Sequence, residues 1–249
     1  MKNILENLNE GWNDMRQYAD TAHIDLPYQL YKPKNFDANR KYPVLLYMHG
    51  MGSCGEDNLK HITVATASII PHLTESEYYS ENVIIIAPQA PSRVQWVDWN
   101  IKEQRFNSDD ITEKLALAFE IFDHCFANML YDEDRVYLWG NSMGAFASFD
   151  MMQRYPDRFA GAVAVAGFGK IELAHKISKN NVWIHHGDVD TLVPFSFSDE
   201  LYNELKRLGA GDNVRLTVYP GQGHSIFADV GNNEDVVKWL FSQKKVKNV

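Results

Sequence analysis

The chain has 249 residues, a length that allows one sizeable core and is short for two ordinary domains. Hydrophobic residues make up 45% and charged residues 23%, the usual mixture of a globular protein. The formal net charge of −9 argues against nucleic acid or an anionic membrane as a partner, since both bind basic surfaces. We therefore expect a single domain over residues 1–249.

Two further features bear on compartment and cofactors. The two cysteines, Cys54 and Cys125, have no spacing typical of a metal site or a redox pair, so we expect free thiols. Residues 1–14 contain no apolar run long enough for a signal peptide, and no stretch approaches the length of a transmembrane helix. The sequence therefore predicts a cytoplasmic protein that uses no cofactor.

Short apolar runs recur along the chain and predict the strands of one sheet. Residues 20–47 begin irregularly and are expected to add antiparallel strands at one edge. The later runs are rich in Val and Ile without strict alternation, which is typical of strands covered on both faces. These predicted strands are 42–49, 82–88, 135–140, 160–167, 181–187 and 214–220.

Helical patterns lie between the apolar runs. Residues 110–129 space their apolar side chains three and four apart, while 142–156 and 196–209 end at a proline and a glycine, two common helix stops. A last helix is predicted over 233–244. Alternating strands and helices predict an α/β fold with a mostly parallel central sheet and helices on both faces. Residues 168–180 are too few for a large lid.

The stretch GNSMG, residues 140–144, ends the apolar run VYLW and opens a predicted helix. In a Gly-x-Ser-x-Gly turn from strand to helix, the serine backbone is strained and its hydroxyl projects above the sheet. The small glycines let a neighbouring chain pass close by. The alternative is a glycine-flanked turn without chemistry, and we expect Ser142 to be a nucleophile instead.

A serine hydroxyl needs a base within hydrogen-bond reach and an acid that orients the base. On this architecture the acid and then the base follow the serine along the chain, at the ends of later strands. His224, in the loop GQGHS after the last predicted strand, is the expected base. Asp188 and Asp190 both follow the preceding strand. We favour Asp190 as the acid and expect Asp188 to cap the turn.

The stretch HHGDVD, residues 185–190, holds two imidazoles and two carboxylates, a composition also found in metal sites. Adjacent residues of a strand point to opposite faces, so His185 and His186 are not expected to share an ion. No further His or Cys cluster completes a ligand set. We therefore expect no metal, and we assign both histidines, like His49, to packing at strand ends.

The negative oxygen that develops during attack by a serine needs hydrogen-bond donors. One expected donor is the backbone N–H of Met143, directly after the nucleophile. The other is the N–H of Met51, in the loop HGMG that follows the first central strand, because glycines let such a loop turn an N–H inward. The alternative for this loop is a glycine-rich surface turn without function.

With these residues in place, the chain resembles α/β-hydrolases, and more narrowly the serine esterases of the feruloyl-esterase and polyhydroxybutyrate-depolymerase-like group, carbohydrate esterase family 1. The likeness runs from about residue 40 and is carried by PVLLYMHGMGSCGEDN, VIIIAPQAPSRVQWVDW, RVYLWGNSMGAFASFDMMQRYP, VWIHHGDVDTLVPF and LTVYPGQGHSIF. The resemblance implies that Ser142 is the nucleophile, Asp190 the acid and His224 the base of an esterase that forms an acyl-enzyme.

Trp96 and Trp99 follow the second central strand and are expected beside the mouth of the site. There they would form an aromatic wall for a flat acyl group or a sugar ring, unless both serve as anchors of a long loop. We expect a carboxylesterase acting on a small-molecule or oligosaccharide ester, with feruloyl and acetyl esters favoured. The alternatives are a peptidase, a thioesterase or a lipid esterase on the same fold, or a non-catalytic binding protein.

Overall fold

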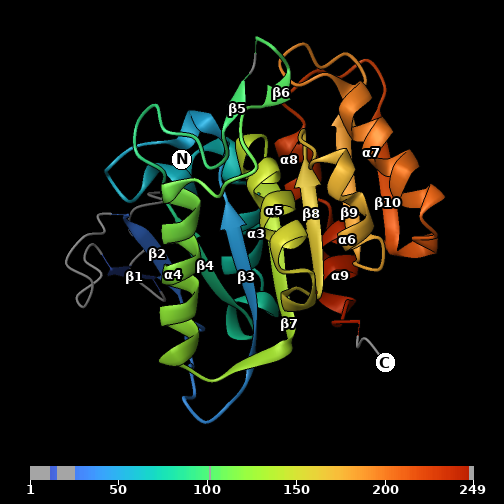
Figure 1. The fold of residues 1–249 in the computed structure, drawn as a ribbon. Coiled ribbons are helices and arrows are strands. Elements are labelled where there is room, and N and C mark those ends of the chain that lie inside the picture. The colour runs from blue at the N-terminus through green and yellow to red at the C-terminus, as the bar shows by residue number, and fades with distance from the viewer. Residues whose placement is uncertain (1–11, 16–25, 101, 247–249) are drawn as a thin grey trace.

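The computed structural model describes residues 12–15, 26–100 and 102–246. Within these residues eight strands form one sheet, in the order β1-β2-β4-β3-β7-β8-β9-β10 (Figure 1). Neighbours from β4 to β10 in this order pair in parallel, whereas β1 pairs with β2 and β2 with β4 antiparallel. The strands are β1 (Trp12–Met15), β2 (Tyr28–Tyr31), β3 (Tyr42–Met48), β4 (Ile84–Pro88), β7 (Tyr131–Asn141), β8 (Gly161–Val165), β9 (Val182–Gly187) and β10 (Val214–Tyr219).

The predicted sheet is confirmed in type and in the position of its strands. The antiparallel edge consists of β1 and β2, of which β2 lies within the irregular early segment and β1 precedes it; residues 20–25 of that segment lie outside the described residues. Residues 1–11, on which the expectation about a leader rests, also lie outside them. The central strand β7 is longer than predicted, because polar residues from Tyr131 onward extend it beyond its apolar run.

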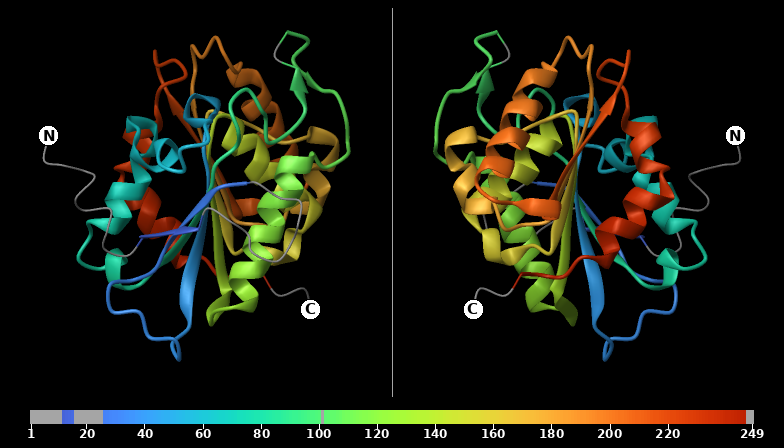
Figure 2. Two further views of the ribbon diagram at one scale, coloured as in Figure 1. Left: turned by 90° about the vertical axis from the view of Figure 1, so that its left-hand side faces the viewer. Right: turned by 90° about the vertical axis from the view of Figure 1, so that its right-hand side faces the viewer.

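Helices cover both faces of the sheet (Figure 2). One face is covered by α4 (Glu113–Ala127), α5 (Met143–Arg154), α6 (Ala174–Ile177) and α7 (Phe195–Arg207). The other is covered by the short α2 (Lys60–Thr63) and by α3 (Ile69–Thr74), α8 (Phe227–Gly231) and α9 (Glu234–Ser242). No helix of the described part of the chain is both long and apolar enough to cross a membrane.

The strand β3 shows why its sequence lacks alternation. Val44, Leu46 and Met48 point into the core beneath α4 and α5, while Leu45 and Tyr47 point into the core on the opposite face. Both sets are fully buried. A strand with apolar contacts on both sides stabilises both layers, so the sequence keeps hydrophobic residues at every position.

Two features beside the carboxyl ends of the strands decide access to that edge. The hairpin of β5 (Trp99–Asn100) and β6 (Arg105–Phe106), which was not predicted, stands beyond the end of the sheet (Figure 1). The connection after β8 contains a 3-10 turn (Ile171–Leu173) and α6, which contacts α5 and α7 instead of roofing the sheet. The predicted absence of a large lid therefore holds for the described residues.

Candidate active site

Ser142 lies at the junction between β7 and α5, in a backbone conformation that residues other than glycine rarely adopt. Its φ is 53° and its ψ is −117°, outside the regions favoured by L-residues. A Cβ on Gly140 would lie 2.2 Å from the Gly144 carbonyl oxygen, and one on Gly144 would lie 1.9 Å from that of Met48. The predicted strain and the close approach through the glycines are both confirmed.

Three side chains from separate strand ends form one hydrogen-bonded chain. His224, in the loop after β10, places Nε2 2.8 Å from the Ser142 Oγ and Nδ1 2.7 Å from Oδ2 of Asp190. Asp190 comes from the loop after β9, and its side chain is 0% exposed, against 16% for that of His224. The structure thus brings together the three residues singled out in the sequence, with the carboxylate shielded from water and the imidazole facing the serine.

The Asp190 carboxylate is held by donors on both of its oxygens. Oδ1 accepts the backbone N–H groups of Leu192 and Val193, each at 2.9 Å, and Oδ2 faces His224 and, at 3.2 Å, Nε2 of His186. Burial by itself raises the pKa of Asp190, but the hydrogen bonds from His186, His224 and Val193 outweigh it and hold the pKa well below its usual range. The geometry therefore keeps an ionised, oriented acid against His224.

The neighbouring polar residues of HHGDVD take other positions. Asp188 accepts the N–H of Gly221 at 2.7 Å and so caps the turn, as predicted. His185 stacks on Trp183 with ring centroids 5.0 Å apart, on the sheet face opposite to His186. Sequence reasoning missed the contact of His186 with the acid. The available signal was its place at a strand end, four residues before Asp190.

The two expected oxyanion donors both begin helical turns beside Ser142. Met143 is the first residue of α5, and Met51 is the first residue of a 3-10 turn (Met51–Ser53) that follows β3. First-turn N–H groups have no acceptor within their own helix and are available to a ligand. A Cβ on Gly50 would lie 3.4 Å from the Ser142 Cβ, so the Met51 loop lies directly against the serine.

His49 orients the Met51 loop through a hydrogen bond to the Gly50 carbonyl. Its Nε2 accepts the N–H of Ala90 at 2.9 Å, so Nδ1 carries the proton and donates to the Gly50 carbonyl at 2.7 Å. Burial lowers the pKa of His49 to about 4, which keeps the ring neutral in this role. Because N–H and C=O of a trans peptide point in opposite directions, the Met51 N–H is turned away from His49.

A pocket of about 530 Å³ opens beside Ser142 and His224. Its walls are mostly apolar and include Met51, Trp99, Phe146, Leu192, Val193 and Phe227. Pockets of this size and character take up small organic groups, with a few polar atoms fixing the orientation. The arrangement places the Ser142 hydroxyl at the edge of a space suited to an apolar group.

The two tryptophans differ in their relation to this pocket. Trp99 lines it, with ring contacts to Phe106, Phe146 and Phe168. Trp96 is 0% exposed and donates its indole N–H to the His49 carbonyl at 3.2 Å. The expectation that Trp96 forms a substrate wall is therefore wrong, because its ring is enclosed beneath the Met51 loop.

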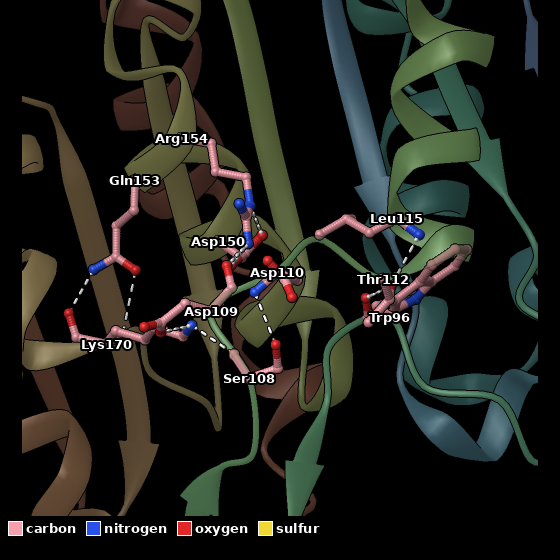
Figure 3. A network of polar contacts seen from close by, with 10 residues as sticks. All are labelled: Trp96, Ser108, Asp109, Asp110, Thr112, Leu115, Asp150, Gln153, Arg154 and Lys170. Carbon is pink, nitrogen blue, oxygen red and sulfur yellow. Dashed lines mark hydrogen bonds and ion pairs between the residues drawn. The ribbon is translucent and has the colours of Figure 1, made fainter.

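A polar network anchors the segment that carries Trp99 (Figure 3). Lys170, whose side chain is only 4% exposed, donates from Nζ to the Ser108 carbonyl at 2.8 Å and pairs with Asp109 at 2.6 Å. Arg154 of α5 donates to the Asp109 carbonyl at 2.7 Å. These contacts connect Ser108 and Asp109, which directly follow β6, to α5 and to the loop after β8.

Residues 36–232 match the family described as Phospholipase/Carboxylesterase. An acyl-protein thioesterase 1 from Neurospora crassa is 25% identical over 210 residues, covering 75% of this chain and 81% of that protein.

Among solved structures, a thermostable esterase gives a TM-score of 0.81 at 24% identity over 96% of this chain, which spans only 64% of that esterase chain. The feruloyl esterase module of Clostridium thermocellum, solved with sinapinate, gives a TM-score of 0.65 at 15% identity, covering 96% and 92% of the two chains. At these identities the likeness concerns the fold.

Proposed function

Because the chain belongs to the phospholipase and carboxylesterase family, we propose that it is a serine carboxylic-ester hydrolase with Ser142 as nucleophile, His224 as base and Asp190 as acid. The resemblance to α/β-hydrolase esterases predicted from the sequence is confirmed by the family match and by the esterase structures. The roles of the individual residues are carried by one observation. This is the hydrogen-bonded chain from Ser142 through His224 to Asp190 at the mouth of an apolar pocket.

In the proposed acylation step, Nε2 of His224 takes the Ser142 proton as Oγ attacks the ester carbonyl. The ionised Asp190 stabilises the imidazolium that forms, and its burial strengthens this interaction. The N–H groups of Met51 and Met143 receive the carbonyl oxygen as it becomes negative. The alcohol leaves with the proton from His224, and the acyl group stays on Ser142.

Deacylation repeats these steps with water as the nucleophile. His224 takes a proton from the water, the same two N–H groups hold the oxyanion, and Ser142 is released with its proton restored. The pocket beside Ser142 holds the acyl group through both steps. The alcohol departs away from the acyl pocket.

The pocket lining favours an ester with a compact apolar acyl group, aromatic or aliphatic. Trp99, Phe146 and Phe227 border the space, and aromatic side chains pack well against a flat ring. We therefore extend the proposal to esters of aromatic acids, including those carried by carbohydrates.

A thioester is the second candidate substrate. The likeness to an acyl-protein thioesterase 1 over 75% of this chain favours it, and the apolar pocket suits an aliphatic acyl chain as well as an aromatic ring. The attack on the carbonyl is the same for both leaving groups. Only the acyl preference and the leaving group distinguish the two candidates.

A substrate panel tests the proposal. Methyl ferulate, p-nitrophenyl acetate and octanoate, an octanoyl thioester and a peptide amide are compared for the wild-type protein and for Ser142→Ala. We expect ester hydrolysis by the wild type and a loss of at least about 10³-fold in kcat for Ser142→Ala with an unchanged circular dichroism spectrum. Covalent labelling of Ser142 by a fluorophosphonate is the second readout. A folded Ser142→Ala protein that retains activity or label contradicts the assignment.

A further inference from the structure

His186 makes contacts that a packing role at the end of β9 does not require. The residue is 0% exposed, and its Nε2 lies 2.9 Å from the Val193 carbonyl oxygen and 3.2 Å from Oδ2 of Asp190. Both of these oxygens are acceptors when Asp190 is ionised. Nε2 therefore carries a proton, which it shares between them.

The opposite side of the ring is fixed as well. Nδ1 of His186 lies 2.7 Å from Oγ of Ser198 on α7, and that hydroxyl lies 3.0 Å from the Gly167 carbonyl oxygen. If Ser198 donates to Gly167, the imidazole donates from Nδ1 and carries two protons. If Ser198 donates to Nδ1, the ring is neutral. In both cases Nε2–H faces Asp190, so the donor to the acid does not depend on the charge of the ring.

We propose that His186 is a positioning residue for the acid, whose Nε2–H holds the Asp190 carboxylate in the orientation that receives the Nδ1–H of His224. The proposal rests on the proposed function, because it assigns a role at the same site. His186 is absent from the pocket lining and touches neither the serine nor the space for substrate. It reaches the site through Asp190 and through the backbone carbonyl of Val193, whose own N–H also holds the Asp190 carboxylate.

The geometry predicts how this positioning affects catalysis. Oδ2 of Asp190 serves both imidazoles, so the hydrogen bond from His186 draws on the same electron density that attracts the His224 proton. Without the hydrogen bond from His186, the Asp190 carboxylate would attract the proton on Nδ1 of His224 more strongly. The titratable groups that bear on His186 are Asp190 beside it and His224 beyond, while α7 contributes the Ser198 hydroxyl and the loop after β8 the Gly167 carbonyl.

Two substitutions separate positioning from packing. His186→Gln keeps an N–H donor near the position of Nε2, whereas His186→Leu keeps volume and removes the donor. For the Leu variant we expect kcat to fall about 10-fold, KM to stay constant, and the acid limb of the kcat/KM profile to move to higher pH by about half a unit or more. For the Gln variant we expect kcat within about 3-fold of wild type and an unmoved acid limb. Equal losses in both variants, or an unmoved acid limb in a folded Leu variant, overturn the proposal.

A spectroscopic measurement keeps the proposal testable even if the Leu variant fails to fold. In ¹⁵N-histidine spectra of the wild-type protein, assigned by the signal lost in His186→Gln, we expect a proton on Nε2 of His186 throughout the pH range of activity. A ring protonated only on Nδ1 overturns the proposal. This readout needs no substrate, so it separates a failure of the His186 assignment from a failure of the esterase assignment, which would appear as an inactive wild-type protein.

Discussion

The two sides of Ser142 are held in place by different forces. On the acid side, Asp190 is fully enclosed and accepts hydrogen bonds from two backbone N–H groups and two imidazoles. On the pocket side, Trp99 packs edge-on against a group of phenylalanine rings, and the segment that carries it is tied down at a distance by Lys170. The acid side is fixed by individual hydrogen bonds, and the pocket side is fixed by the packing of aromatic rings.

This difference separates what the site must keep from what it is free to change. Hydrogen bonds demand donors and acceptors within a few tenths of an ångström and weaken steeply with angle, so we expect a substitution on the acid side to remove the proposed activity. Aromatic contacts tolerate small shifts at modest cost, so we expect a substitution on the pocket side to change the proposed preference for the acyl group. Mutations on the two sides are expected to differ in size and in kind.

The largest effect is expected from Asp190→Asn. The new amide carries no charge, and its NH₂ group would face N–H donors, so the variant loses both the ion pair with His224 and the carboxylate geometry. We expect kcat to fall about 10³-fold or more. Asp188→Asn is the matched control, because it disturbs only the turn at Gly221 and should stay within several-fold of wild type. Comparable losses in both variants would remove the distinction between acid and cap.

Gly144→Ala tests whether the turn from β7 to α5 that carries Ser142 is packed as tightly as the surroundings of Asp190. A Cβ at this position would lie 1.9 Å from the Met48 carbonyl oxygen, a backbone atom that cannot move without shifting β3. We expect a loss of about 3 kcal/mol or more in the free energy of unfolding, measured by urea titration. Gly52→Ala is the stability control, since a Cβ there meets nothing within 4 Å. Equal stabilities would show that the junction relaxes easily.

The same contrast explains what the sequence could predict. Ser142, Asp190 and His224 each follow an apolar run, and parallel strands bring their carboxyl ends to one edge, so chain order alone placed the three residues together. The four long helices were recognisable because their apolar residues repeat over several turns. These features follow from periodicity and topology, which a single sequence carries.

The missed features depend on how loops fold back. His186 meets Asp190 only because the turn after β9 returns the carboxylate over the strand end, and no period marks that contact. Trp96 and Trp99 are three residues apart in an irregular segment, so the sequence did not tell which ring faces the pocket. The β5 and β6 strands have two residues each, too few for a pattern.

A pair of tryptophan variants tests the pocket side. Trp99→Leu removes an aromatic wall, and we expect the ratio of kcat/KM for methyl ferulate to that for p-nitrophenyl acetate to change about 10-fold. Trp96→Phe deletes the hydrogen bond to the His49 carbonyl beneath the site and should lower stability while leaving that ratio unchanged. A change of the ratio in the Trp96 variant and not in the Trp99 variant would show that Trp96, instead of Trp99, forms the wall of the substrate site.

The smallest effect is expected from Lys170→Met, which probes the remote anchor of the pocket wall. The substitution keeps the length of the side chain and its packing near Phe106 but removes the donor to the Ser108 carbonyl and to the Asp109 carboxylate. Because Phe106 contacts Trp99, the loosened segment should raise KM for methyl ferulate about 3-fold, with kcat for p-nitrophenyl acetate unchanged. The melting temperature should fall by a few degrees.

Lys176→Met on α6 is the control for this last variant, because Lys176 is exposed and lies outside the network of Figure 3. If only the Lys170 variant alters KM for the bulky ester, the pocket wall is held from a distance, through packing against a tethered loop. If Lys170→Met instead lowers kcat for both esters equally, the anchor also bears on Ser142 through α5. The acid side and the pocket side would then both depend on α5. The difference between them would apply to the contacts at the site but not to the elements that hold those contacts in place.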